Sequence, residues 1–263
     1  MRRNVVGLFA GLLSLGVVQV ASAADMPTKG PFYKAPAAVP FSWAGGYVGV
    51  NGGYGWNNKD VVVNETLAGA AFVSGTWPGS GTFGSRNNNG GFFGGQAGYN
   101  WQNGSLVFGP EADIQWSGIK GSSNATLPYI SGVNTITTNT SGSLTWFGTL
   151  RGRIGVAFDR ALVYATGGLA LGNAKYSMTM SDTFNYNAAG STNSNSAGWV
   201  LGGGLEYMLM PQWSVKGEYQ YISFGTKTIN AAEVGGVNPN YAINTSAKSN
   251  FQTVRVGLNY HFN

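Results

Sequence analysis

The charged side chains that could do chemistry in this sequence stand in pairs two residues apart. Glu111 and Asp113 form one such pair, and Arg151 and Arg153 form another. Two neighbouring carboxylates can act as general acid and base or can hold a divalent cation. In an extended strand, residues two apart point to the same face, where opposite charges on a neighbouring strand neutralise them. We therefore favour ion pairing between the acidic and basic pairs over catalysis or metal binding.

Other candidates for catalysis are few. The single histidine is His261, and the sequence contains no cysteine. One imidazole gives little support for a Ser/His nucleophile, and no thiolate is available for catalysis or metal binding. No glycine-rich loop ends in the Gly-Lys-Ser/Thr pattern that binds phosphate. The sequence predicts a protein that is not an enzyme, with no catalytic residue, metal site or cofactor.

The composition excludes several classes of protein. Of the 263 residues, 42 are glycine, 13% are aromatic and only 10% are charged. A soluble domain usually carries about 25% charged and about 7% glycine residues, so a conventional soluble enzyme is disfavoured. The aromatic content excludes a disordered chain. The formal net charge of +5 is too weak a balance to indicate nucleic acid as a partner.

The first 23 residues have the pattern of a secretory signal peptide. A basic start at residues 1–4 precedes an apolar run at 5–18 and the small-x-small motif Ala21-Ser22-Ala23. The alternative is a retained anchor, but the run is interrupted by glycine and is shorter than the roughly 20 residues of a helical span. Residues 24–42 hold four prolines and are predicted to form an extended periplasmic lead-in.

Beyond residue 42, large apolar residues alternate with small or polar ones at a period of two. This alternation indicates β-strands, and each stretch is close to the roughly 9–11 residues of a tilted strand that crosses a bilayer. Only residues 161–173 are ambiguous, because both of their parities are small or apolar. The eight stretches are 47–56, 92–102, 106–117, 144–156, 161–173, 197–209, 213–223 and 250–262.

Charged residues within these stretches all fall on the parity opposite the large apolar side chains. A charge that faces lipid at the bilayer midplane costs about 2–4 kcal/mol, so the apolar parity is predicted to face lipid. The charges are then expected to form one compensating network in the lumen, the alternative being that water solvates each charge separately. A lipocalin-like soluble barrel would instead leave a surface of glycine and asparagine with few charges. The predicted network consists of Glu111, Asp113, Arg151, Arg153, Glu206, Lys216, Glu218 and Arg255.

Connections between the stretches alternate between long and short. The long ones, rich in Asn, Ser, Thr and Gly, are residues 57–90, 118–141, 176–195 and 225–248, whereas 103–105, 159–160 and 210–212 are tight turns. This pattern is typical of an all-β, eight-stranded antiparallel up-and-down transmembrane barrel over residues 43–263, with four long external loops and short periplasmic turns. Aromatic residues near the strand ends are predicted to form interfacial girdles. These residues are Trp43, Trp56, Trp101, Trp116, Trp213, Tyr260 and Phe262.

Several segments resemble a known family. Residues 43–56 (WAGGYVGVNGGYGW), 94–102 (GGQAGYNWQ), 151–155 (RGRIG) and 255–260 (RVGLNY) are similar to strands of the small alpha-proteobacterial outer-membrane proteins. That surface-antigen and porin-like group has an OmpA-type eight-stranded barrel. The resemblance implies localisation in the cell outer membrane, with lipid, lipopolysaccharide and the outer-membrane assembly machinery as partners. Such barrels usually end on an aromatic residue, whereas here Asn263 follows the last aromatic.

Two classes of function remain. Eight strands leave an interior only just wide enough for side chains to fill, which favours a structural and surface-interaction role. The loops would then meet an external or host ligand. The alternative is a small porin that passes small hydrophilic solutes through a narrow lumen.

Overall fold

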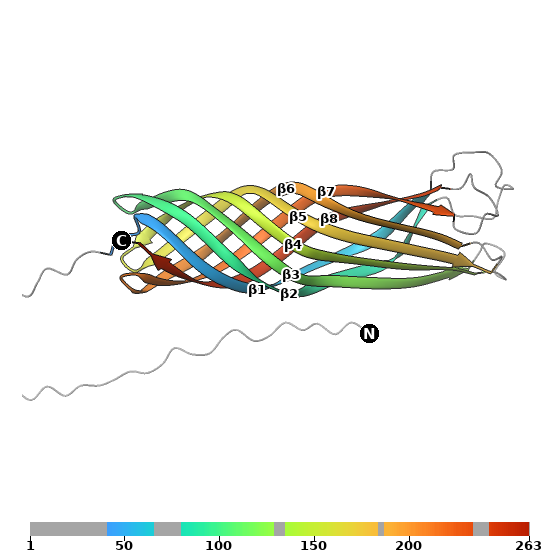
Figure 1. The fold of residues 1–263 in the computed structure, drawn as a ribbon, viewed down its shortest axis with the longest axis horizontal. Coiled ribbons are helices and arrows are strands. Elements are labelled where there is room, and N and C mark those ends of the chain that lie inside the picture. Colours follow the sequence, from blue (N-terminus) through green and yellow to red (C-terminus); the bar gives the residue numbers. More distant parts are fainter. Residues whose placement is uncertain (1–40, 66–79, 129–134, 184–186, 234–241, 263) are drawn as a thin grey trace, which may run out of the picture. The chain divides into compact units, whose positions relative to one another are not determined.

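A closed ring of eight antiparallel β-strands forms the protein (Figure 1). The computed structural model describes residues 41–65, 80–128, 135–183, 187–233 and 242–262. The predicted signal peptide at 1–23, all but the last two residues of the lead-in and Asn263 lie outside this part. Each strand pairs with its neighbours in sequence, and β1 closes the ring by pairing with β8. The strands are β1 Gly45–Glu65, β2 Ser80–Asn103, β3 Leu106–Pro128, β4 Thr135–Phe158, β5 Ala161–Asp182, β6 Asn187–Met210, β7 Trp213–Glu233 and β8 Ala242–His261.

The predicted all-β barrel is therefore confirmed, and its tight turns lie where the sequence places them. Asn103 pairs with Leu106 across β2 and β3, and Phe158 pairs with Ala161 across β4 and β5, so two residues suffice for each turn. The turn between β2 and β3 needs a positive φ, which Gly104 supplies at +61° without a side-chain clash. All three two-residue turns leave the barrel at the same end.

At the other end, the strands are longer than the sequence predicts. They run for 20 to 24 residues, so most of the segments expected as long loops are paired strand. The expectation of irregular loops at 57–90, 118–141, 176–195 and 225–248 is wrong in this respect. Many residues there are polar on both faces, so hydrophobic alternation is weak, although Tyr176, Met178 and Met180 on β5 still alternate with exposed polar residues. Hydroxyl groups also interact between neighbouring strands. The Ser141 and Ser177 hydroxyls, for example, lie 2.7 Å apart.

The extended half is not a continuous ring. The recorded pairing of β2 with β3 goes no further than Asn89 and Lys120, and pairing of β6 with β7 lapses between Trp199 and Ala189. Pairing continues between β3, β4, β5 and β6 on one side of these two seams. In the described strands, the extended half is therefore open between β2 and β3 beyond Asn89, and the gap between β6 and β7 closes again where Ala188 and Ala189 pair with Glu233 and Ala232.

Large apolar side chains cover the outside of the ring. On β3 they run from Leu106 to Trp116, ten residues along the strand. At about 3.3 Å per residue and the usual tilt of about 40°, this is a band about 25 Å tall, the height of a lipid-facing band. Aromatic rings lie at both limits, with Trp101 against Phe108 near the short turns and Phe93 stacked on Trp116 at the opposite side. No helix within the described ranges is long and apolar enough to span a membrane.

Two residues predicted to face lipid lie inside the barrel. Trp43 is fully buried rather than part of a girdle, because its ring packs against His261 and its Nε1 donates to the Asp159 carbonyl at 3.3 Å. Leu144 shares its parity with Trp146 in the sequence, but a bulge between them turns Leu144 inward, where it is 3% exposed. A bulge adds one unpaired residue and so reverses the facing of the residues beyond it.

We predict that the two ends of the barrel lie on opposite sides of a membrane. Epitope tags inserted within 66–79, 129–134, 184–186 or 234–241 should bind antibody on intact cells, because these segments follow the extended strands. A tag between Asp159 and Arg160 should bind only after the cells are permeabilised. Labelling of the 159–160 tag on intact cells would reverse the topology.

Candidate functional site

Eight charged side chains meet in the interior of the ring, in the half that carries the apolar band. They come from β3, β4, β6, β7 and β8, and in each case inward parity places them there. The least buried of them, Asp113, is 8% exposed, and the others are 3% exposed or less. They are Glu111, Asp113, Arg151, Arg153, Glu206, Lys216, Glu218 and Arg255, and we call them the lumen network.

Glu111 is the centre of the lumen network. Its carboxylate accepts hydrogen bonds from Arg151 on the adjacent strand and from the Lys216 ammonium across the lumen, at 2.9 Å to each oxygen. The Tyr47 hydroxyl donates to it at 2.6 Å, and an Arg255 nitrogen lies 3.4 Å away. One carboxylate thus contacts cations from three strands, which ties together strands that are not neighbours in the ring.

Asp113 and Glu218 lie on either side of two guanidinium groups. Arg151 donates to Asp113 at 2.9 Å and to Glu218 at 2.7 Å. Arg255 makes the same two contacts at 3.1 Å and 2.6 Å. Thr149 donates to Asp113 at 2.7 Å, so the remaining lone pairs of the buried carboxylate also have partners. Charge-assisted hydrogen bonds of this kind offset much of the desolvation of buried ions.

Glu206 forms the end of the lumen network nearest the short turns. It pairs with Arg153 at 2.7 Å and accepts a hydrogen bond from Asn259 at 2.7 Å. Lys216 stands directly opposite Glu206 in the register of β6 and β7, yet its ammonium reaches Glu111 instead. Arg153 also donates to Tyr47 at 2.9 Å, which joins this end to the centre.

Neutral polar residues that the sequence does not single out extend the lumen network to β1 and β2. Asn51 donates to Gln96 at 2.8 Å, and Gln96 donates in turn to Asn259 at 2.5 Å. Tyr164 on β5 donates to Glu218 at 2.7 Å. The inward orientation of three of these residues can be predicted from the sequence, because they lie on the polar parity of their strands: Asn51, Gln96 and Asn259. The orientation of Tyr164 cannot, because both parities of residues 161–173 are small or apolar.

An apolar layer fills the lumen beyond the charges, toward the extended half. Phe92 packs edge-on against Phe147 with ring centroids 5.2 Å apart, and Phe224 packs against Phe251 at 6.3 Å. Strand β1 contributes glycine here, because a Cβ at Gly53 would lie 2.6 Å from the Phe92 ring. The layer consists of Phe92, Ile119, Leu144, Phe147, Ala170, Ala174, Tyr176, Val200, Ile222, Phe224 and Phe251. The charged and apolar layers thus lie in series along the interior, and a second buried apolar cluster of Trp43, Val107, Leu162, Tyr164 and Met208 lies near the short turns.

A Ser-His-Glu group near the short turns resembles a catalytic triad in composition alone. Ser214 Oγ lies 2.9 Å from His261 Nε2, but the hydroxyl also donates to Glu206 at 2.6 Å. In a triad the acid orients the imidazole through its second nitrogen, whereas here Glu206 and Ser214 both lie on the Nε2 side. All three residues are at most 1% exposed, so a substrate has no access to the hydroxyl. The geometry is that of a buried hydrogen-bonded cluster.

Metal binding has no support in the part of the chain that the structure describes, where no three His, Cys, Asp or Glu side chains gather as a ligand group. The acidic residues of the lumen network contact cationic side chains instead. Glu111 and Asp113, which could hold a divalent ion by type and spacing, both bind Arg151 and Arg255.

Comparison with known proteins agrees with this architecture. A family model described as an outer membrane protein beta-barrel domain matches residues 10–262. The chain belongs to this outer-membrane β-barrel family. It is 36% identical to the 31 kDa outer-membrane immunogenic protein of Brucella melitensis biotype 1 over 255 residues, which cover 92% of this chain and 93% of that protein. Its location is the outer membrane.

Two further comparisons concern a second relative and a solved structure. The 22 kDa outer membrane protein of Rhizobium leguminosarum bv. viciae is 31% identical over 233 residues, covering 86% of this chain and 88% of that protein. Among solved structures, the outer membrane protein OprG from Pseudomonas aeruginosa is 12% identical, with a TM-score of 0.49. That match covers 83% of this chain and 96% of OprG.

We predict direct coupling between charges in contact within the outer-membrane barrel. Arg151→Met should lower the free energy of unfolding by about 3–5 kcal/mol, because Glu111 and its neighbours lose a buried cation. Adding Glu111→Gln should restore part of this loss, which urea titration followed by tryptophan fluorescence in lipid can measure.

A matched control pairs Arg151→Met with Glu206→Gln, since these two side chains form no ion pair in the described network. This second double variant should show a smaller coupling energy than the first, because no direct contact joins the two side chains. Equal coupling in both double variants would mean that the ion pairs act only through the overall charge of the lumen.

Proposed function

We propose that this outer-membrane barrel is a non-conducting structural protein that presents its extended strands at the cell surface. The observation that supports this most directly is the filled interior, where the lumen network and the apolar layer occupy successive levels. An ion would have to displace buried salt bridges at one level and enter an apolar environment at the next. Both steps are costly, because a buried ion without a partner is poorly solvated.

The alternative within the same fold is a small porin. A water-filled porin interior is lined by polar side chains that remain hydrated. Here the arginines that could line such a path, Arg151 and Arg255, are 2% and 1% exposed and bind carboxylates from two strands. Their contacts favour a closed lumen.

A role without catalysis is part of the same proposal. The buried Ser214–His261 contact offers no open nucleophile, and the 31 kDa relative from Brucella melitensis is named as an outer-membrane immunogenic protein. We propose that this chain is exposed to the exterior through its extended half. Its partners would then be outer-membrane lipid, lipopolysaccharide, the assembly machinery that inserts the barrel, and an external or host ligand at the segments that join the extended strands.

Conductance tests the closed lumen. The refolded protein should show little or no steady current in planar bilayers, and Arg151→Gly with Arg153→Gly should also stay closed because the apolar layer remains. Adding Phe92→Ala and Phe147→Ala to those changes should open a measurable conductance. A large, stable current in the unmodified protein would make the porin function the better proposal.

Folding must be checked in the same preparations. Each variant should keep its β-rich circular dichroism spectrum and its shift in gel mobility on heating, which report an intact barrel. Leu169→Ala, on the lipid-facing surface, serves as a control that removes apolar volume outside the lumen and should leave the current unchanged.

A further inference from the structure

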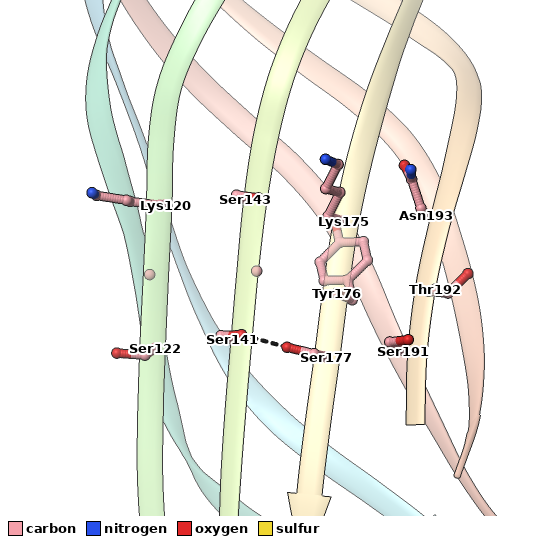
Figure 2. A pocket seen from close by; sticks show the side chains of 12 residues that line it. Lys120, Ser122, Ser141, Ser143, Lys175, Tyr176, Ser177, Ser191, Thr192 and Asn193 are labelled. Atoms are coloured by element: carbon pink, nitrogen blue, oxygen red, sulfur yellow. Dashed lines mark hydrogen bonds between the residues drawn. The ribbon is translucent and has the colours of Figure 1, made fainter. Parts of the chain in front are cut away.

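A pair of lysines stands on the outer surface of the extended half, just beyond the lipid-facing band. Lys120 on β3 and Lys175 on β5 are both exposed. Each is paired in register with Ser143 on β4, the strand between them, so the three residues form one row across the sheet. Figure 2 shows this row with Asn193 of β6 at its far side. At about 4.8 Å between strands, the two lysine Cα atoms lie about 10 Å apart.

Neither ammonium has an acidic partner within the described residues. All ion pairs recorded there involve the lumen network or His261, which lie inside the ring. Within the described part of the chain, the two cations are therefore not neutralised. Two uncompensated cations on one row, on flexible stems that can converge, form a site for an anion such as a phosphate.

The surface next to the lysines is rich in hydroxyl groups. Ser122, Ser141, Ser177 and Ser191 form the next outward-facing row, parallel to the first (Figure 2). Together the two rows line an open depression with a volume of about 680 Å³. A second depression of about 360 Å³ continues it, and Asn and Thr side chains join the serines there. Hydroxyl and amide groups of this kind hydrogen-bond sugars, which present the same groups.

The height of the row above the membrane decides what can occupy it. Trp116 ends the apolar band on β3, and Lys120 follows four residues later, with a bulge between them. At about 3.3 Å per residue and a tilt of about 40°, the row lies about 10 Å above the aromatic limit of the band. Headgroups extend about 5–7 Å beyond the hydrocarbon core on each side, so the row stands at their outer edge, where the flexible lysine stems reach them.

We propose that Lys120 and Lys175 bind the phosphorylated sugar headgroup of a glycolipid in the outer leaflet. The ammonium groups contact phosphate, and the serine row contacts the sugar. The acyl chains lie against the apolar band below. This assignment rests on the proposed topology, with the extended half outside, and adds a specific lipid site to the barrel surface.

Lipid retention measured by native mass spectrometry tests the site. The probes are lipid A with two phosphates and the same lipid after enzymatic dephosphorylation, each offered to the refolded barrel in detergent. Lys120→Ser with Lys175→Ser should weaken binding of the phosphorylated lipid about thirtyfold, since each lysine near an anionic surface contributes about fivefold. The two proteins should bind the dephosphorylated lipid equally.

The control variant is Arg160→Ser, which removes one exposed cation at the short-turn end and should leave lipid retention unchanged. Inorganic phosphate at millimolar concentration should compete poorly, because it lacks both sugar and acyl chains; full competition would assign the site to free phosphate instead. Equal retention of phosphorylated lipid by the lysine variant and the unmodified protein would overturn the proposal. The same samples can be tested for conductance, so loss of the lipid site and failure of the closed lumen are distinguishable.

Discussion

Lipid solvates neither an ionised side chain nor an unpaired backbone amide. Every strand of the barrel must therefore pair its backbone amides and keep its charged side chains away from lipid. The pairing of β1 with β8 removes the last free edges, so that each amide within the band has a partner in a neighbouring strand. The cost of placing a charge in lipid also turns charged side chains inward, because a strand has only two faces and the other face points into the lumen. The outside of the ring is consequently a continuous surface of residues such as Val50, Leu150 and Leu205.

Once the charges point inward, they must be solvated within a narrow lumen. An eight-stranded ring has little room for water, so the charges that lipid excludes must solvate one another. Four acidic and four basic side chains do so here, with Glu111 contacting cations from three strands. Formal neutrality compensates for the lost hydration, together with arginines that each contact two or more carboxylates. The filled interior thus follows from the requirement for an apolar exterior.

The sequence predicts well which side chains face lipid and which face the lumen. Each side chain has only these two orientations, and the apolar/polar alternation recurs several times along each strand. It thereby places Arg151, Glu218 and the other charges inside. It does not predict which charges touch, since the long stem of Lys216 passes over its register neighbour Glu206 to reach Glu111. Bulges escape prediction for a related reason: the extra residue between Leu144 and Trp146 reverses the facing of Leu144 without any change in composition.

The length of the strands also escapes prediction, because most of the extended half is polar on both faces and the alternation that remains, at Tyr176, Met178 and Met180, is short. The interruptions in pairing between β2 and β3 and between β6 and β7 free that half from the geometric constraint of a closed ring. In a closed ring, strand number and shear fix the diameter, so a shift in one register must be matched around the circle. The extended half is interrupted between β2 and β3 and, over part of its length, between β6 and β7, so it does not have to obey that rule. Hairpins beyond the seams can lengthen, shorten or be exchanged as modules while the diameter of the membrane ring stays constant, so the two halves of one chain can diversify at separate rates.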